Sequence, residues 1–225
     1  IDIGDELRLL RGLTFTLAET LATGTVGQGA DGLLAGSLRL TSPDLAKPAA
    51  LAALDLRGAA DLDLVLSRRA GQQHLAVTGD IADLATGDIR LATLTLAADI
   101  VDLFGVPLAA GEGALTGFAL GGFGVDRATV IARRSDESLM DVTATARLAL
   151  GTDIALAGSL ESLAPGIRVA LRTLSVEGFG QAARLTAPAT ITLEGPNIAA
   201  SALAFDIGGG AVILEGGRSD VWDVA

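Results

Sequence analysis

The feature that most constrains this chain is a side-chain period of two, broken at short intervals by glycine. In "DLDLVLS", residues 61–67, the apolar residues Leu62, Leu64 and Leu66 alternate with aspartate and valine. Successive side chains of a β-strand point to opposite faces of its sheet. The pattern therefore predicts a strand with one apolar face and one face in water, as in antiparallel sheets.

The same alternation recurs along most of the chain, and glycine-containing turns separate the runs. The sequence holds 29 glycines, many of them at the ends of alternating runs, where positive φ angles are needed. Turn signals such as Gly79-Asp80, Gly87-Asp88, Gly121-Gly122 and Gly208–Gly210 leave strands of roughly 6 to 10 residues, about a dozen or more in all. Further alternating runs occupy residues 89–100, 141–150, 167–178, 189–195 and 203–214.

One segment departs from the period of two. Residues 42–54, "SPDLAKPAALAAL", are rich in alanine and leucine, and Ser42 before Pro43 and Asp44 is a suitable N-terminal cap. Pro48 limits any helix to about two turns. We therefore expect an all-β fold with one short helix near residues 43–54, because such a helix is too short to form a layer of its own.

Composition describes the apolar face and excludes several partners. Half of the residues are hydrophobic but only 3% are aromatic, which favours a thin or elongated apolar layer over a thick core filled by large rings. A formal net charge of −11 argues against nucleic acids, which require clustered lysine and arginine. It argues equally against electrostatic binding to anionic membrane surfaces.

Few side chains offer reactive chemistry. The chain has no cysteine and one histidine, so disulfides, thiol nucleophiles and cysteine-based metal sites are excluded. No run of about 18 uncharged apolar residues suits a membrane-spanning helix. We expect no cofactor, no metal and no enzymatic activity.

Three motifs that match functional patterns are better explained structurally. "GQGADG", residues 27–32, matches a dinucleotide-binding pattern, but residues 33–42 are typical of a strand rather than the required helix. His74 has no cluster of partners and is expected at the surface or in a turn. Asp61 and Asp63 share one strand face, which solvated alternation explains better than a pair of glycosidase carboxylates.

An all-β chain of this kind must cover its apolar face. Two sheets can pair face to face, one sheet can close into a barrel, or a sheet can curl into a trough. The pattern of residues alone leaves these three solutions open.

Several stretches resemble the large periplasmic subunit of the translocation and assembly module, the TamB family of the AsmA-like superfamily. "SPDLAKPAALAALDLRGAADLDLVL" resembles that family's short helical insert followed by an alternating strand, and "GDIADLATGDI" resembles the linking phrase after it. The family's succession of strand, turn and strand also occurs in "GALTGFALGGFGVDRATVIARRSDESLMDVTATARL" and "TLEGPNIAASALAFDIGGGAVILEG". The resemblance covers about Leu38 to Val224, and residues 1–37 match less clearly.

The resemblance implies an elongated, mainly antiparallel sheet curled into a U-shaped apolar trough, with residues 1–225 forming one unit. It also implies a periplasmic segment of an inner-membrane-anchored protein in Gram-negative bacteria. Such proteins carry phospholipid between the inner and outer membranes and support assembly of outer-membrane proteins. We expect this chain to be an internal piece that contacts phospholipid acyl chains. An outer-membrane barrel partner would be reached through other parts of the full protein.

An alternative from another class is a structural β-solenoid or adhesin passenger whose apolar face is a sealed core. The two hypotheses differ in whether the apolar face is left open to a ligand. We expect the longer apolar members of the alternating runs to line that face. The predicted groove-lining residues are Leu62, Leu64, Leu66, Leu94, Leu96, Phe118, Leu120, Leu148, Leu150, Val169, Leu171, Phe205 and Ile207.

Overall fold

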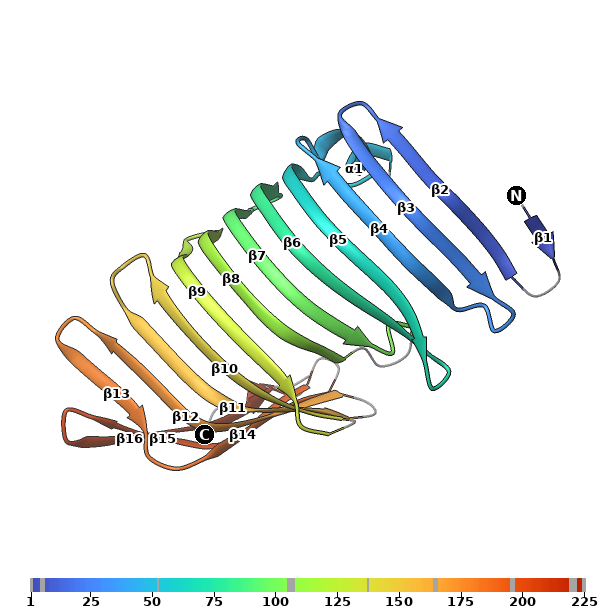
Figure 1. Cartoon of the computed structure of the whole chain (residues 1–225). Helices are drawn as coiled ribbons and strands as arrows, with labels where there is room; N and C mark the ends of the chain where they lie inside the picture. The colour runs from blue at the N-terminus through green and yellow to red at the C-terminus, as the bar shows by residue number, and fades with distance from the viewer. Residues whose placement is uncertain are drawn as a thin grey trace. The chain divides into compact units, whose positions relative to one another are not determined.

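The computed structural model describes residues 2–4, 7–51, 53–104, 108–136, 138–163, 166–194, 197–218 and 222–223. The chain is all-β apart from one short helix, which confirms the predicted fold class. It divides into two compact units, residues 1–124 and 125–225, where the sequence predicted one. The boundary falls just after the predicted turn at Gly121-Gly122, and each unit is described by itself (Figure 1).

The first unit is an antiparallel meander in which each strand pairs with the next. Short turns join most of these strands, as predicted at Gly87-Asp88 and Gly121-Gly122. The elements are β1 Asp2–Gly4, β2 Leu7–Leu17, β3 Thr20–Gly29, β4 Leu34–Ser42, α1 Ala46–Leu51, β5 Arg57–Arg69, β6 Gln72–Thr86, β7 Ile89–Val101 and β8 Leu108–Leu120. The predicted turn at Gly79-Asp80 was wrong, because both residues lie inside β6, whose 15 residues also exceed the expected strand length.

The second unit is also antiparallel, with one interruption. Strands β9 to β12 pair in sequence, and β12 then pairs with β13 along one part and with β14 along another. Both short strands pair with β15, so together they fill the position of one strand. The elements are β9 Phe123–Arg134, β10 Leu139–Leu148, β11 Asp153–Leu163, β12 Gly166–Gly178, β13 Gln181–Leu185, β14 Ala189–Glu194, β15 Asn197–Ile207, β16 Gly210–Arg218 and β17 Trp222–Asp223.

Helix α1 lies within the predicted range but is shorter, with six residues. The Asp44 carboxylate caps its first turn, since Oδ1 accepts a hydrogen bond of 3.0 Å from the Ala46 amide. At the other end Ala53 adopts a left-handed φ of +54°, and the Leu54 amide donates to the Ala49 carbonyl at 2.9 Å. This left-handed residue ends the helix and returns the chain toward β5.

Glycines inside the strands of the first unit allow the strands to bend. Gly36 has a φ of +144° and Gly79 a φ of +146°, angles that side chains other than glycine rarely adopt. A Cβ at Gly36 would lie 1.9 Å from the Thr25 carbonyl oxygen, and one at Gly79 would lie 2.0 Å from the Asp61 carbonyl oxygen. Glycine kinks of this kind introduce sheet curvature, and strands β5 to β7 are visibly bowed in Figure 1.

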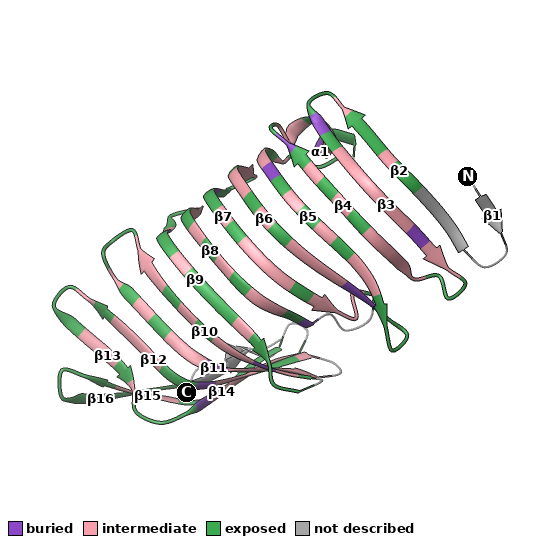
Figure 2. Cartoon of the chain, in the orientation of Figure 1, coloured by how far each residue is buried: buried purple, intermediate pink, exposed green. Residues whose placement is uncertain are grey.

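Little of the described chain is fully buried. The buried hydrophobic residues are Ala49, Ala60, Leu91, Leu108, Val125, Met140, Leu171 and Ala189. Figure 2 shows the buried positions as isolated bands among strands of intermediate and exposed residues. The sheets therefore have no thick central core among the residues described, in agreement with the low aromatic content.

Candidate functional site: an apolar sheet face

The register between strands gathers the predicted leucines of the first unit on one face. Paired residues share a face in an antiparallel sheet, and Leu38 pairs with Leu64, which in turn pairs with Val77. One row along, Leu40 pairs with Leu62. Five predicted lining residues lie on this side, together with neighbours of the same parity. We call this the apolar face, and its members are Leu38, Leu40, Leu62, Leu64, Leu66, Leu75, Val77, Ile81, Leu94, Leu96, Ile100 and Leu115.

The opposite side of the same strands is polar. The Arg39 guanidinium lies between two carboxylates of β5, with Nη2 2.6 Å from Asp61 and Nη1 in contact with Asp63. Beside them the Thr95 hydroxyl donates to Asp80 Oδ1 at 2.6 Å. The two aspartates of "DLDL" therefore form an exposed ion-pair network with arginine, as the solvated interpretation of that motif requires. This side is called the polar face.

The apolar face is only partly covered by protein. Each of the twelve side chains named for it is half-buried, and none reaches the burial of a core residue. The chain exposes 13847 Å² in total, whereas a compact globular protein of its 22.6 kDa exposes about 9500 Å². A single-layer sheet with one apolar face open to solvent accounts for an excess of this kind.

The second unit repeats the separation of faces. Leu160 pairs with both Met140 and Val169, and Leu156 pairs with Leu174 and Ala144. Of the predicted lining residues, Leu148, Val169, Leu171, Phe205 and Ile207 lie in strands of this unit on that apolar side. Leu171 is buried at 8% exposure, while Ile207 is 38% exposed.

Three predicted lining residues lie outside these rows. Leu150 is in the β10–β11 turn with 80% of its surface exposed, because the Leu148 amide already donates to the Thr152 carbonyl at 2.8 Å and closes the hairpin. Phe118 and Leu120 are not joined to these rows by a leucine pair: Leu120 pairs with Ile89 and is 48% exposed. They come after Gly117, whose φ of +62° interrupts the regular strand before them.

Seven members of the apolar face were not among the predicted lining residues: Leu38, Leu40, Leu75, Val77, Ile81, Ile100 and Leu115. Leu38 and Leu40 alternate with polar residues in "GSLRLTS", residues 36–42, so the same period-two signal would have found them. Ile81 lies inside β6 and is followed by Ala82, and Ile100 is the penultimate residue of β7 after Ala97 and Ala98, so that alanines obscure the alternation near both.

His74 was expected at the surface or in a turn, and that prediction was wrong. It is the third residue of β6 and only 7% exposed, with Nδ1 lacking a hydrogen-bond partner. The Leu103 amide donates to the Gln73 carbonyl at 3.0 Å, which brings the chain after β7 against this end of β6. The backbone after β7 thus covers His74, although the local sequence indicates only that this residue lies near the end of a strand.

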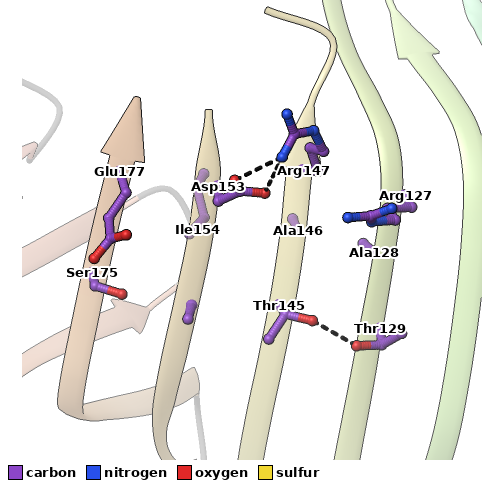
Figure 3. Close-up of a pocket in the computed structure, with 11 residues that line it drawn as sticks. Arg127, Ala128, Thr129, Thr145, Ala146, Arg147, Asp153, Ile154, Ser175 and Glu177 are labelled. Atoms are coloured by element: carbon purple, nitrogen blue, oxygen red, sulfur yellow. Dashed lines mark hydrogen bonds and ion pairs between the residues drawn. The ribbon is translucent and has the colours of Figure 1, made fainter. Parts of the chain in front are cut away.

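A shallow depression of about 330 Å³ lies on the polar face of the second unit, across β9 to β12 (Figure 3). Arg147 Nη1 donates to both oxygens of Asp153 at 3.1 and 2.8 Å, and the hydroxyls of Thr129 and Thr145 are 2.7 Å apart. Its lining contains no histidine or cysteine, and its strongest contacts are internal ion pairs and hydroxyl pairs. Nothing in this lining forms a nucleophile–base pair.

Metal-binding clusters and membrane-spanning helices are both missing from the described part of the chain. There, no three histidine, aspartate or glutamate side chains come together in a way that could hold a metal ion. Among the same residues, no helix has the length and apolarity to cross a membrane.

The fold and the open apolar face define an all-β protein built of single-layer antiparallel sheets. Comparison with protein-family models, with curated proteins and with solved structures finds no match to this chain.

Proposed function

We propose that this chain is a non-catalytic, periplasmic segment of a TamB-like bridge protein whose apolar face forms a trough for phospholipid acyl chains. In this proposal it helps to carry phospholipid between the inner and outer membranes, and so supports assembly of outer-membrane proteins. The barrel partner is met by other parts of the full protein. The acidic polar face keeps the sheet in solution.

The observation that carries the proposal is the incomplete burial of the leucine rows. In a sealed β-solenoid the same leucines would be packed by protein on every side, whereas here they are half-buried. Acyl chains that cover the remaining area gain about 25 cal/mol per Å² of apolar surface removed from water. Such contacts are weak, similar and non-directional, which suits a lipid that moves along the sheet rather than binding at one point.

Native mass spectrometry of the purified chain after expression in a Gram-negative periplasm tests the proposal. We expect phospholipid to co-purify with the wild type. Leu64→Arg should reduce the bound fraction strongly, because it places a charge in the middle of the apolar face. Thr78→Arg is the matched control: Thr78 lies one residue from Val77, the partner of Leu64, but on the polar face, so lipid should be retained.

Two results would contradict the proposal. One is a folded wild-type chain without phospholipid, which favours the sealed β-solenoid or adhesin passenger. The other is an equal loss of lipid in both arginine variants, which would mean that the lipid does not occupy the leucine rows.

A further inference from the structure

The apolar face of the first unit has two unlike margins. At one end of β3 to β5, three further residues have their side chains on the same side as the leucines. They are Thr20, Ser42 and Ala60, which are only 3%, 1% and 5% exposed, respectively. The two hydroxyls pair with each other, with Thr20 Oγ1 2.7 Å from Ser42 Oγ. This end is closed by protein, unlike the half-buried leucines next to it.

Helix α1 is what closes that end. The Leu45 amide donates to the Gly58 carbonyl at 2.7 Å, which fixes the start of the helical segment to the beginning of β5. Ala49 of α1 is 7% exposed, and its small side chain permits close approach to the sheet. Helix α1 contacts β5, and Figure 1 shows it near the start of that strand. We call this the helical margin.

At the opposite end of the same strands, polar residues have their side chains on the side of the apolar face. Gln28 pairs with Leu34, and Arg68 pairs with Gln73. The Gln73 amide is 1% exposed, accepts from the Leu34 amide at 2.7 Å and donates to the Leu34 carbonyl at 2.9 Å. We call this end, formed by Gln28, Leu34, Arg68 and Gln73, the polar margin.

Arg68 gives the polar margin its charge. Its guanidinium reaches the end of β3, since a Cβ on Gly29 would be 2.0 Å from Nη1. Its ion pair with Asp31 is loose, at 3.6 Å, and the Arg68 side chain remains 37% exposed. One partly exposed cation is therefore held at this end of β3 to β5, beyond the leucine rows, where an anionic group can reach it.

The leucine rows between the margins match one acyl chain in length. From Ala60 to Arg68 is eight residues, or about 26 Å along an extended strand, and the leucines from 62 to 66 span about 13 Å of it. The hydrocarbon core of a bilayer is about 30 Å thick, so one leaflet contributes about 15 Å. A chain of leaflet length thus fits along the strands, between a polar end and a closed apolar end.

We propose that phospholipid lies along the strand direction of the first unit, with its phosphate headgroup at the polar margin beside Arg68. Its acyl ends point toward the helical margin, where α1 stops them. This inference rests on the proposed function, because it assigns an orientation to the lipid that the trough would carry. It makes α1 a barrier along one side of the lipid path, so that headgroups leave the sheet on one side only.

The absence of cysteine allows a direct test by site-specific fluorescence quenching. Single cysteines replace Gln28 at the polar margin, Leu62 near the helical margin and Thr78 on the polar face, and each is labelled with bimane. The full chain is incubated with phosphatidylcholine vesicles that carry a nitroxide either on the headgroup or near the end of an acyl chain. It is then separated from the vesicles, so that quenching reports bound lipid.

The orientation predicts opposite preferences at the two labelled ends. Headgroup nitroxide should quench the label at 28 more strongly than acyl nitroxide does, and the order should reverse at 62. Equal or inverted preferences, with both positions quenched above position 78, would overturn the orientation and leave lipid binding intact. Quenching at 28 and 62 no greater than at 78 would overturn the proposed function itself.

A charge variant tests the headgroup contact separately. Arg68→Gln should reduce the preference of the chain for phosphatidylglycerol over phosphatidylcholine on the order of fivefold, the effect expected from one cation near an anionic lipid. Arg69→Gln, the neighbouring arginine on the opposite parity, is the matched control and should leave the ratio unchanged. An unchanged ratio in Arg68→Gln, or an equal fall in both variants, would overturn the assignment of the headgroup to Arg68.

Discussion

Replacement of Leu64 by arginine separates an open apolar face from a sealed core by its effect on stability. Full burial of a leucine side chain stabilises a protein by about 1.5–3 kcal/mol. Leu64 is partly buried, so its contribution is about 1–2.5 kcal/mol by the same area argument. The arginine alkyl stem retains part of this contact while the guanidinium reaches water. We therefore expect Leu64→Arg to lower the free energy of unfolding by about 1 kcal/mol.

A sealed core predicts a much larger loss. An unpaired charge forced among packed side chains costs about 3–5 kcal/mol or prevents folding. Leu171 supplies this comparison within the same chain, because it is 8% exposed. Leu171→Arg should therefore destabilise the protein several times more than Leu64→Arg does.

Urea denaturation followed by far-UV circular dichroism measures both variants, with Thr78→Arg as the control for an added charge. The shift of the midpoint at constant slope gives the change in stability. A cost for Leu64→Arg as large as that for Leu171→Arg would refute the open face, since Leu64 would then be packed as a core residue. Equal destabilisation by Thr78→Arg and Leu64→Arg would also refute it, because the charge rather than the face would then be responsible.

Two further predictions concern the backbone and one exposed carboxylate. Gly79→Ala should destabilise the fold by about 1–3 kcal/mol through its strained φ and the neighbouring carbonyl, whereas Gly122→Ala, which meets open space, should change the urea midpoint little. A hydrogen bond from the Ser135 hydroxyl, and then the Arg172 guanidinium, hold the pKa of Asp141 below its ordinary 3.8. Ser135→Ala should raise that pKa in a carbon-detected NMR titration. Because the folded-state pKa is depressed, the associated stability is present above the unfolded pKa and lost as pH falls through the folded value; an Asp141 pKa unmoved by the substitution would contradict this cause.

Local sequence was sufficient to predict which residues of a strand share a face. Leu62, Leu64 and Leu66 lie opposite Asp61 and Asp63, as their spacing predicts. The period of two arises from backbone sterics within a few residues, so it does not depend on the rest of the chain. The short helix was predictable for the same reason, because its composition and cap are local.

How strands meet and where they end depends on contacts between distant parts of the chain. Leu150 continues the alternation of its run, yet a hairpin closed by the pair Arg147 and Asp153 places it in the turn. Gly117, with its φ of +62°, interrupts β8, so that the face of Phe118 and Leu120 no longer follows from their spacing to Leu115. Where a hairpin closes and where a strand is interrupted depend on pairing with other strands. A shift of one residue in that pairing moves every following side chain to the other face of the sheet.

The degree of burial was likewise set by the tertiary structure. His74 is covered because the backbone after β7 hydrogen-bonds to Gln73, about thirty residues earlier in the chain. The leucine rows remain half-buried because no second layer of the described first unit packs on them beyond α1. An alternating strand looks the same whether its apolar side meets another sheet, a helix or a lipid, since the period reports only that the side must be kept from water.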